Sequence, residues 1–173
     1  MRECLALLIR AVLLAACAVP VQGQVKHITA FTGTWKFNAA RSEFNPGPPF
    51  KSFTLTFTPD GVRHLDLVLG DGQRLKAELP WSDGKVVSVV VKEGSMGNVK
   101  AVSRIAGKVF DDTWTENGKL IEKVHGEISP DGQTLTVTVE GPTHEGGTFR
   151  NRVVFDKQQA AKRRAAPLQK RWQ

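Results

Sequence analysis

The stretch AFTGTWKFNAARSEF, residues 30–44, contains the first strand-like segment of the chain and ends it within a few residues. Its run GTWKF places Trp35 in the middle of an extended segment, where so large an apolar side chain favours burial. The following NAARSEF favours one short helical turn capped by Asn38, and the prolines of NPGPPF then require extended chain. We therefore expect a first strand with a buried tryptophan, a short turn and a long connection.

Beyond residue 50 the chain alternates short β-rich runs with turn-forming pairs. SFTLTFT places Phe53, Leu55 and Phe57 on one face of an extended chain and hydroxyl side chains on the other. The runs HLDLVL, RLKAELPW and TLTVTVE repeat this period of two. Between the runs lie pairs that suit tight hairpins, namely Asp60-Gly61, Asp71-Gly72, Asp83-Gly84, Asn117-Gly118 and Asp131-Gly132. Each of these predicted strands therefore has one apolar face and one polar face.

Short connections require neighbouring strands to be antiparallel. A long meander with one apolar face cannot stay flat and open, because strand twist and exposed edges oppose it. We predict an all-β fold, an antiparallel up-and-down barrel of about 8–10 strands, with a short N-terminal helical turn or lid and a flexible basic C-terminal tail. A two-layer sandwich is the alternative. The first long connection would cross one mouth of a barrel as a lid, or would change sheets in a sandwich.

The first 23 residues have the features of a secretory signal. Arg2 and Arg10 flank an apolar run, AVLLAACAVPV follows, and small residues precede a cleavage point after Gly23. The alternative is the lipobox-like Leu14-Ala15-Ala16-Cys17, whose cysteine would carry a lipid anchor. The predicted protein is exported, periplasmic or secreted, with a signal at 1–23, a barrel at 24–156 and a tail at 157–173. Both cysteines lie in the signal, so the mature chain has no disulfide or cysteine-based metal site.

The net charge of +7 lies at the two ends of the chain. Residues 157–173 carry six of these charges and residues 1–23 carry one, so residues 24–156 are neutral. Because the neutral domain does not interleave basic with aromatic residues, we expect no nucleic-acid partner. The tail, which includes Trp172, either contacts an anionic membrane surface or remains a solvated end.

Gly33-Thr34-Trp35 resembles the Gly-x-Trp motif of the calycins, and residues 31–36 resemble the opening of intracellular fatty-acid-binding proteins. Over most of residues 30–156 the pattern is similar to uncharacterised exported bacterial proteins of the lipocalin-like kind. The resemblance implies that Gly33 and Trp35 close one end of the barrel, with the Trp35 ring under a basic side chain from the last strand. The candidates for this side chain are Arg150 and Arg152, unless both face solvent.

The resemblance also implies a binding protein that encloses a small hydrophobic molecule, a lipid or similar. The residues expected to line its site are Phe53, Leu55, Phe57, Leu67, Leu79, Trp81 and Val89, with Arg104 as a candidate internal anchor. Fatty-acid-binding relatives hold a carboxylate with an Arg-x-Tyr arrangement, and this chain has no tyrosine, which argues against a fatty acid. Alternatively, the same side chains fill the interior of a structural or interaction domain at the cell envelope.

No enzyme signature is present, and the sequence predicts no catalytic residue, metal or cofactor. Asp112 is expected between the inward-facing Phe110 and Trp114, but the adjacent Asp111 then faces the other way, so the two cannot act together. We therefore expect solvation to be the role of Asp111, Asp112 and the nearby Glu116. The histidines are scattered, at His27, His64, His125 and His144. An enzyme would require two or more titratable side chains that converge inside the barrel.

Overall fold

The computed structural model describes residues 28–45, 50–143 and 145–159. The predicted signal and Cys17, and the tail beyond residue 159, lie outside the described residues. The elements are β1 (Gly33–Phe37), the 3-10 turn η1 (Ala39–Arg41), β2 (Ser52–Phe57), β3 (Val62–Val68), β4 (Arg74–Pro80), β5 (Val86–Ser88), β6 (Val90–Glu93), β7 (Val99–Ala106), β8 (Val109–Glu116), β9 (Lys119–Ile128), β10 (Thr134–Pro142) and β11 (Thr148–Lys157).

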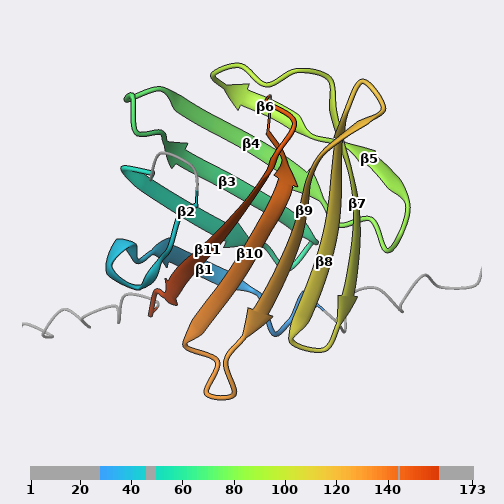
Figure 1. Cartoon of the computed structure of the whole chain (residues 1–173). Helices are drawn as coiled ribbons and strands as arrows, with labels where there is room; N and C mark the ends of the chain where they lie inside the picture. The colour runs from blue at the N-terminus through green and yellow to red at the C-terminus, as the bar shows by residue number, and fades with distance from the viewer. Residues whose placement is uncertain (1–27, 46–49, 144, 160–173) are drawn as a thin grey trace, which may run out of the picture.

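The strands form one antiparallel sheet that nearly closes on itself (Figure 1). Its order is β5-β7-β8-β9-β10-β11-β1-β2-β3-β4-β6. The two outer members, β5 and β6, are consecutive in the chain and separated only by Val89. Because β5 pairs with β7 and β6 pairs with β4, one short stretch of chain bonds to both flanks of the sheet. This arrangement confirms the predicted all-β antiparallel barrel, with residues 86–93 as the closing strand.

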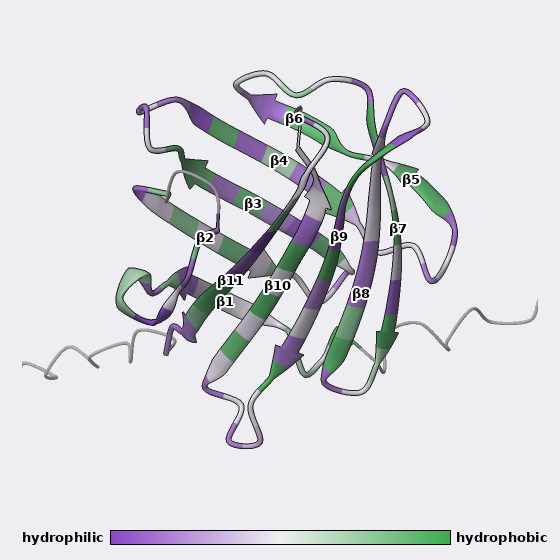
Figure 2. Cartoon of the chain, viewed as in Figure 1, coloured by the Kyte–Doolittle hydropathy of each residue, from purple (hydrophilic) through white to green (hydrophobic). Residues whose placement is uncertain are grey.

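The alternation of apolar and polar residues decides which side chains enter the barrel. Figure 2 shows this alternation as bands along β2, β3, β4 and β10. On β10, Leu135 and Val137 are buried while the intervening threonines are partly exposed. The closing strand departs from the pattern, since Val86 and Val90 are exposed on the outside. A run that is apolar on both faces is therefore used where the barrel closes.

Trp35 closes one end of the barrel. Its side chain is fully buried, and its indole Nε1 donates a hydrogen bond to the Phe31 carbonyl oxygen at 2.7 Å. The Nζ of Lys157 lies 4.8 Å from the centre of the Trp35 ring. Gly33 has a φ of 124°, a backbone conformation that favours glycine, and a Cβ there would lie 3.4 Å from the Lys157 side chain. A basic side chain from the last strand therefore covers Trp35, as the resemblance implied.

That basic side chain is Lys157, and not Arg150 or Arg152. Lys157 is the cross-strand partner of Trp35 and belongs to the same alternating set as the buried Val153 and Phe155. Arg150 and Arg152 belong to the other set and are exposed. The correction follows from the length of β11, which continues one residue past the boundary predicted at 156, so that the cation comes from the first residue assigned to the tail.

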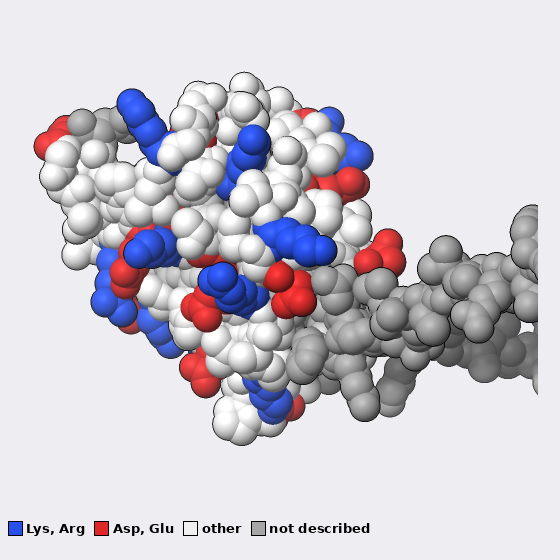
Figure 3. All heavy atoms as spheres, turned by 90° about the vertical axis from the view of Figure 1, so that its right-hand side faces the viewer, with Lys and Arg blue, Asp and Glu red and all other residues white. Residues whose placement is uncertain are grey.

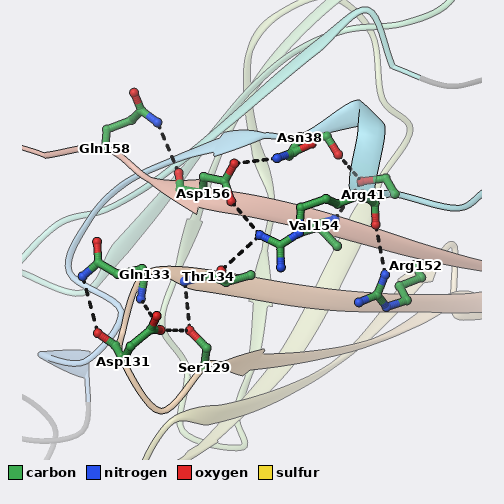
Figure 4. Close-up of polar contacts among 11 residues, drawn as sticks. Asn38, Arg41, Ser129, Asp131, Gln133, Thr134, Arg152, Val154, Asp156 and Gln158 are labelled. Carbon is green, nitrogen blue, oxygen red and sulfur yellow. Dashed lines mark hydrogen bonds and ion pairs between the residues drawn. The ribbon is translucent and has the colours of Figure 1, made fainter.

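The segment 38–45 runs along the outside of β11 and contains the predicted helical turn, η1. Asn38 precedes η1 but does not cap it through its side chain, which instead donates to Asp156 Oδ2 at 2.6 Å. Arg41 contacts the other oxygen of Asp156 at 3.1 Å, and the Val154 N–H donates to Ser42 Oγ at 2.9 Å. Figure 4 shows these contacts between the turn and β11. They hold the start of the long connection against the barrel wall.

Two phenylalanines of the long connection pack inward. Phe44 and Phe50 stack edge-to-face on Phe37, with ring centres 6.2 and 6.0 Å away, and Phe50 also contacts Phe53. Phe53 in turn contacts Phe155. The connection therefore contributes apolar side chains to the interior, as a lid over a barrel mouth would.

Acidic and basic side chains are interspersed over the outer surface seen in Figure 3. Several form ion pairs across neighbouring strands, such as Lys76 with Glu93 at 2.6 Å and Lys92 with Glu78 at 3.0 Å. Within residues 28–45, 50–143 and 145–159, no helix has the length and apolar character needed to cross a membrane.

Candidate functional site

The barrel encloses a cavity of about 330 Å³. Its wall is mostly apolar and comes from both sides of the barrel, with Phe53, Leu55 and Leu67 on one side and Val124, Val137 and Val153 on the other. Phe50 from the long connection and Met96 from the loop before β7 also line it. A volume of this size lies within the range of small-molecule sites in proteins.

Three of the seven predicted apolar lining residues, Phe53, Leu55 and Leu67, border this cavity. Phe57, Leu79 and Trp81 do not border it. Phe57 and Leu79 are buried in the core, and the Trp81 and Phe57 rings pack against Phe110. Val89 is partly buried at the junction of β5 and β6. The interior is therefore divided into a filled aromatic base around Phe57 and a hollow part around Phe53.

Arg104 is not an internal anchor. It is exposed, and its guanidinium lies near Gly84 on the outer surface. On β7 the inward positions are the buried Ala101 and Ser103, so the period of two places Arg104 outside. Its cross-strand partner there is Asp111, a residue of opposite charge.

Among the described residues, the buried basic side chain inside the barrel is that of Arg63 in β3. Its Nη2 donates to Asp112 Oδ2 of β8 at 2.5 Å, and the side chains are 3% and 0% exposed. The guanidinium carbon also lies 5.8, 5.4 and 5.0 Å from the ring centres of Phe57, Trp81 and Phe110. Since Arg63 and Asp112 both border the cavity, this ion pair lies where the cavity meets the aromatic base.

The ion pair leaves hydrogen-bonding capacity unused. Asp112 Oδ1 and Arg63 Nε are buried without a hydrogen-bond partner, as is the nearby Ser103 Oγ. Trp114 Nε1 donates to Asp112 Oδ2 at 3.4 Å, so both observed contacts go to the same carboxylate oxygen. Unpaired buried polar atoms cost free energy, and a polar group of a bound molecule would relieve that cost.

Glu122 of β9 is a second carboxyl group on the cavity wall. It is the cross-strand partner of Trp114, whereas Asp112 is the partner of Val124, so the two carboxyls are diagonal neighbours across β8 and β9. Burial raises the pKa of Glu122 to about 7, and the Asp112 charge adds to this effect while Arg63 opposes it. Glu122 therefore changes its protonation state near neutral pH.

Replacing Glu122 by glutamine is expected to remove part of the pH dependence of stability. The raised pKa means that the folded protein keeps a proton that the unfolded chain releases above its ordinary pKa of 4.5. The stability linked to this proton is complete below about pH 4.5 and is lost as the pH rises through 7, a change of roughly 2–4 kcal/mol. Urea denaturation should show that the free energy of unfolding falls less between pH 5 and pH 8 in Glu122→Gln than in the wild type. Glu140→Gln, on the outer surface, should keep the wild-type difference; equal differences in all three proteins would contradict the assignment.

Asp112 is buried between Phe110 and Trp114, as the alternation of the strand predicted, although the sequence favoured a solvated role for its carboxylate. Arg63 and Glu122 were not among the residues predicted to line the site. The alternation of the strands nevertheless places both residues inward, because Arg63 lies two residues before Leu65 and Glu122 lies two residues before Val124. Charge alone suggested a solvent-facing position and obscured that periodicity.

The two described histidines within strands lie on the outer surface. His64 approaches Glu78 at 3.6 Å and His125 contacts Asp111 at 2.7 Å, while His27 and His144 lie outside the described residues. In the part of the chain that the structure describes, no three His, Cys, Asp or Glu side chains are grouped closely enough to hold a metal ion.

The candidate site is therefore an apolar cavity with one ion pair and one titratable carboxyl on its wall. Comparison of the chain with protein-family models, with curated proteins and with solved structures found no match to any of them.

Proposed function

We propose that this protein binds a small, mainly apolar molecule inside its barrel. The observation that carries the proposal is the cavity of about 330 Å³, walled mostly by Phe, Leu and Val side chains and bordered by a few polar groups. Such a combination is typical of small-molecule sites, in which apolar contacts supply affinity and a few polar contacts set orientation. The hollow also argues against an interior that is filled throughout.

The proposal extends to a calycin-like binding protein that acts outside the cytoplasm. Support for the calycin-like assignment comes from the nearly closed antiparallel barrel and from Trp35 beneath Lys157 at its end. Support for export comes from the signal-like residues 1–23, with lipid attachment at Cys17 as the alternative route. The basic residues after 157 would then favour binding of the protein to an anionic membrane surface.

Binding of a neutral fluorescent dye such as Nile red tests the proposal. We expect micromolar affinity and energy transfer to the dye from Trp114, which borders the cavity. Val139→Trp fills part of the cavity and should weaken binding by about tenfold or more, about 1.4 kcal/mol. Val86→Trp, the same change at an exposed position, should leave binding unchanged. A dye that fails to bind the folded wild type, with no lipophile in solvent extracts, would contradict the proposed function.

Acid–base catalysis on the bound molecule is a second candidate function. It is favoured by the two carboxyls that converge at the cavity, Asp112 and Glu122, of which Glu122 has a pKa of about 7 and can exchange a proton at neutral pH. Asp112 is already held by Arg63, so Glu122 is the candidate for proton transfer. If the extracted molecule is recovered chemically unchanged after incubation with wild type and with Glu122→Gln, the catalytic candidate is rejected and binding remains.

A further inference from the structure

The charges on the cavity wall are unequal in sign. Among the described residues that border the cavity, the ionisable side chains are Arg63 of β3, Asp112 of β8 and Glu122 of β9. The single positive charge is already in contact with Asp112. The cavity therefore presents one compensated ion pair and one further carboxyl. Arg63 Nε has no hydrogen-bond partner, but the charge of Arg63 is balanced by Asp112, so an anionic ligand would meet no uncompensated positive charge on the described cavity wall.

One carboxylate oxygen of this cluster is an acceptor without a donor. Asp112 Oδ1 has no hydrogen-bond partner, and the Asp112 side chain is buried on the cavity wall. Glu122, its diagonal neighbour across β8 and β9, lies at a separation of roughly 7–8 Å between backbone positions, within reach of one bound polar group. A ligand group that donates several hydrogen bonds could donate to both carboxyls.

We propose that the ligand of this cavity is an amphipathic amine, whose ammonium group lies between Asp112 and Glu122 while its apolar part fills the hollow lined by Phe53, Leu67 and Val137. This inference rests on the proposed function and specifies its ligand class. An ammonium balances the charges, because two carboxylates then face Arg63 and one ligand cation. A ligand carboxylate would instead add a further negative charge beside Asp112 and Glu122, where the charge of Arg63 is already balanced by Asp112.

Proton release should accompany amine binding. Glu122 is mostly protonated below neutral pH because burial disfavours its charge. A nearby ammonium supplies the missing counter-charge and favours the carboxylate, so binding is linked to loss of the proton. Alkylamines stay protonated up to about pH 10, and the affinity should therefore rise as the pH increases from 6 to 8.

The experiment compares decylamine, decanol and decanoic acid as competitors of a bound neutral dye at pH 6 and pH 8. We expect decylamine to compete about tenfold better than decanol at pH 8, to compete less well at pH 6, and decanoic acid to be the weakest of the three. Glu122→Gln should remove both the preference for the amine and its pH dependence. Glu140→Gln, with the same change on the outer surface, should retain them.

The possible failures are distinguishable. If the dye binds but the alcohol or the acid competes as well as the amine, the amine proposal is overturned and the binding function remains. If the amine preference persists in Glu122→Gln, the assigned carboxyl is wrong and the proposal is likewise overturned. If neither dye nor any of the three compounds binds the folded wild-type protein, the proposed function itself fails.

Discussion

Replacing Asp112 by alanine is expected to lower the free energy of unfolding by about 3–5 kcal/mol. The reason is the position of Arg63, whose guanidinium is buried and makes its contact with a carboxylate through Asp112. Removal of that carboxylate leaves an uncompensated positive charge inside the barrel. Chemical denaturation followed by tryptophan fluorescence measures the loss.

Two further variants separate the charge effect from loss of packing. Asp111→Ala changes the neighbouring aspartate on the exposed side of β8 and should cost less than about 1 kcal/mol. The double variant Arg63→Met with Asp112→Leu removes both charges and should recover most of the stability lost in Asp112→Ala. A loss in the double variant as large as in the single variant would contradict this account.

Replacing Trp35 by alanine should also cost about 3–5 kcal/mol. Trp35 is fully buried and contacts three parts of the closed end: the Phe31 carbonyl oxygen, the Lys157 ammonium and its cross-strand partner Leu55. Alanine would leave a cavity and an unpaired carbonyl group there. Thermal and urea denaturation should both show the loss, and Leu120→Ala, at a 41% exposed position, should change stability little.

Conservative changes test each contact of Trp35 on its own. Trp35→Phe keeps an aromatic ring but removes the indole donor to Phe31, with an expected cost of about 1–3 kcal/mol. Lys157→Gln removes the cation above the ring at a cost of about 1 kcal/mol, whereas Arg150→Gln should have no measurable effect on the closed end. If Arg150→Gln were the more damaging of the two, the placement of Lys157 over Trp35 would be wrong.

These predictions concern two different regions of the interior. Trp35 belongs to the packed end of the barrel, and the ion pair of Arg63 with Asp112 marks the boundary of the hollow part. Variants at Trp35 should therefore affect stability without changing ligand preference. Glu122→Gln, in contrast, should change ligand preference and the pH dependence of stability.

Much of the architecture could be predicted from local patterns. The alternation in SFTLTFT placed Phe53, Leu55 and Phe57 on one face, and all three face the core of the barrel. The same rule, applied without regard to charge, also identifies Arg63, Asp112 and Glu122 as inward-facing. The rule could not distinguish residues that border the cavity from those that fill the base, as Phe53 and Phe57 illustrate.

What the sequence determined by itself is the side of the sheet on which each residue lies, together with the turns that make the strands antiparallel, because both depend on neighbours within a few residues. What only the tertiary structure decided is which inward side chains meet across the interior. Arg63 reaches Asp112 and Lys157 covers Trp35 because the barrel closes with a particular strand order and register. That register is a property of the whole sheet, and no local pattern contains it.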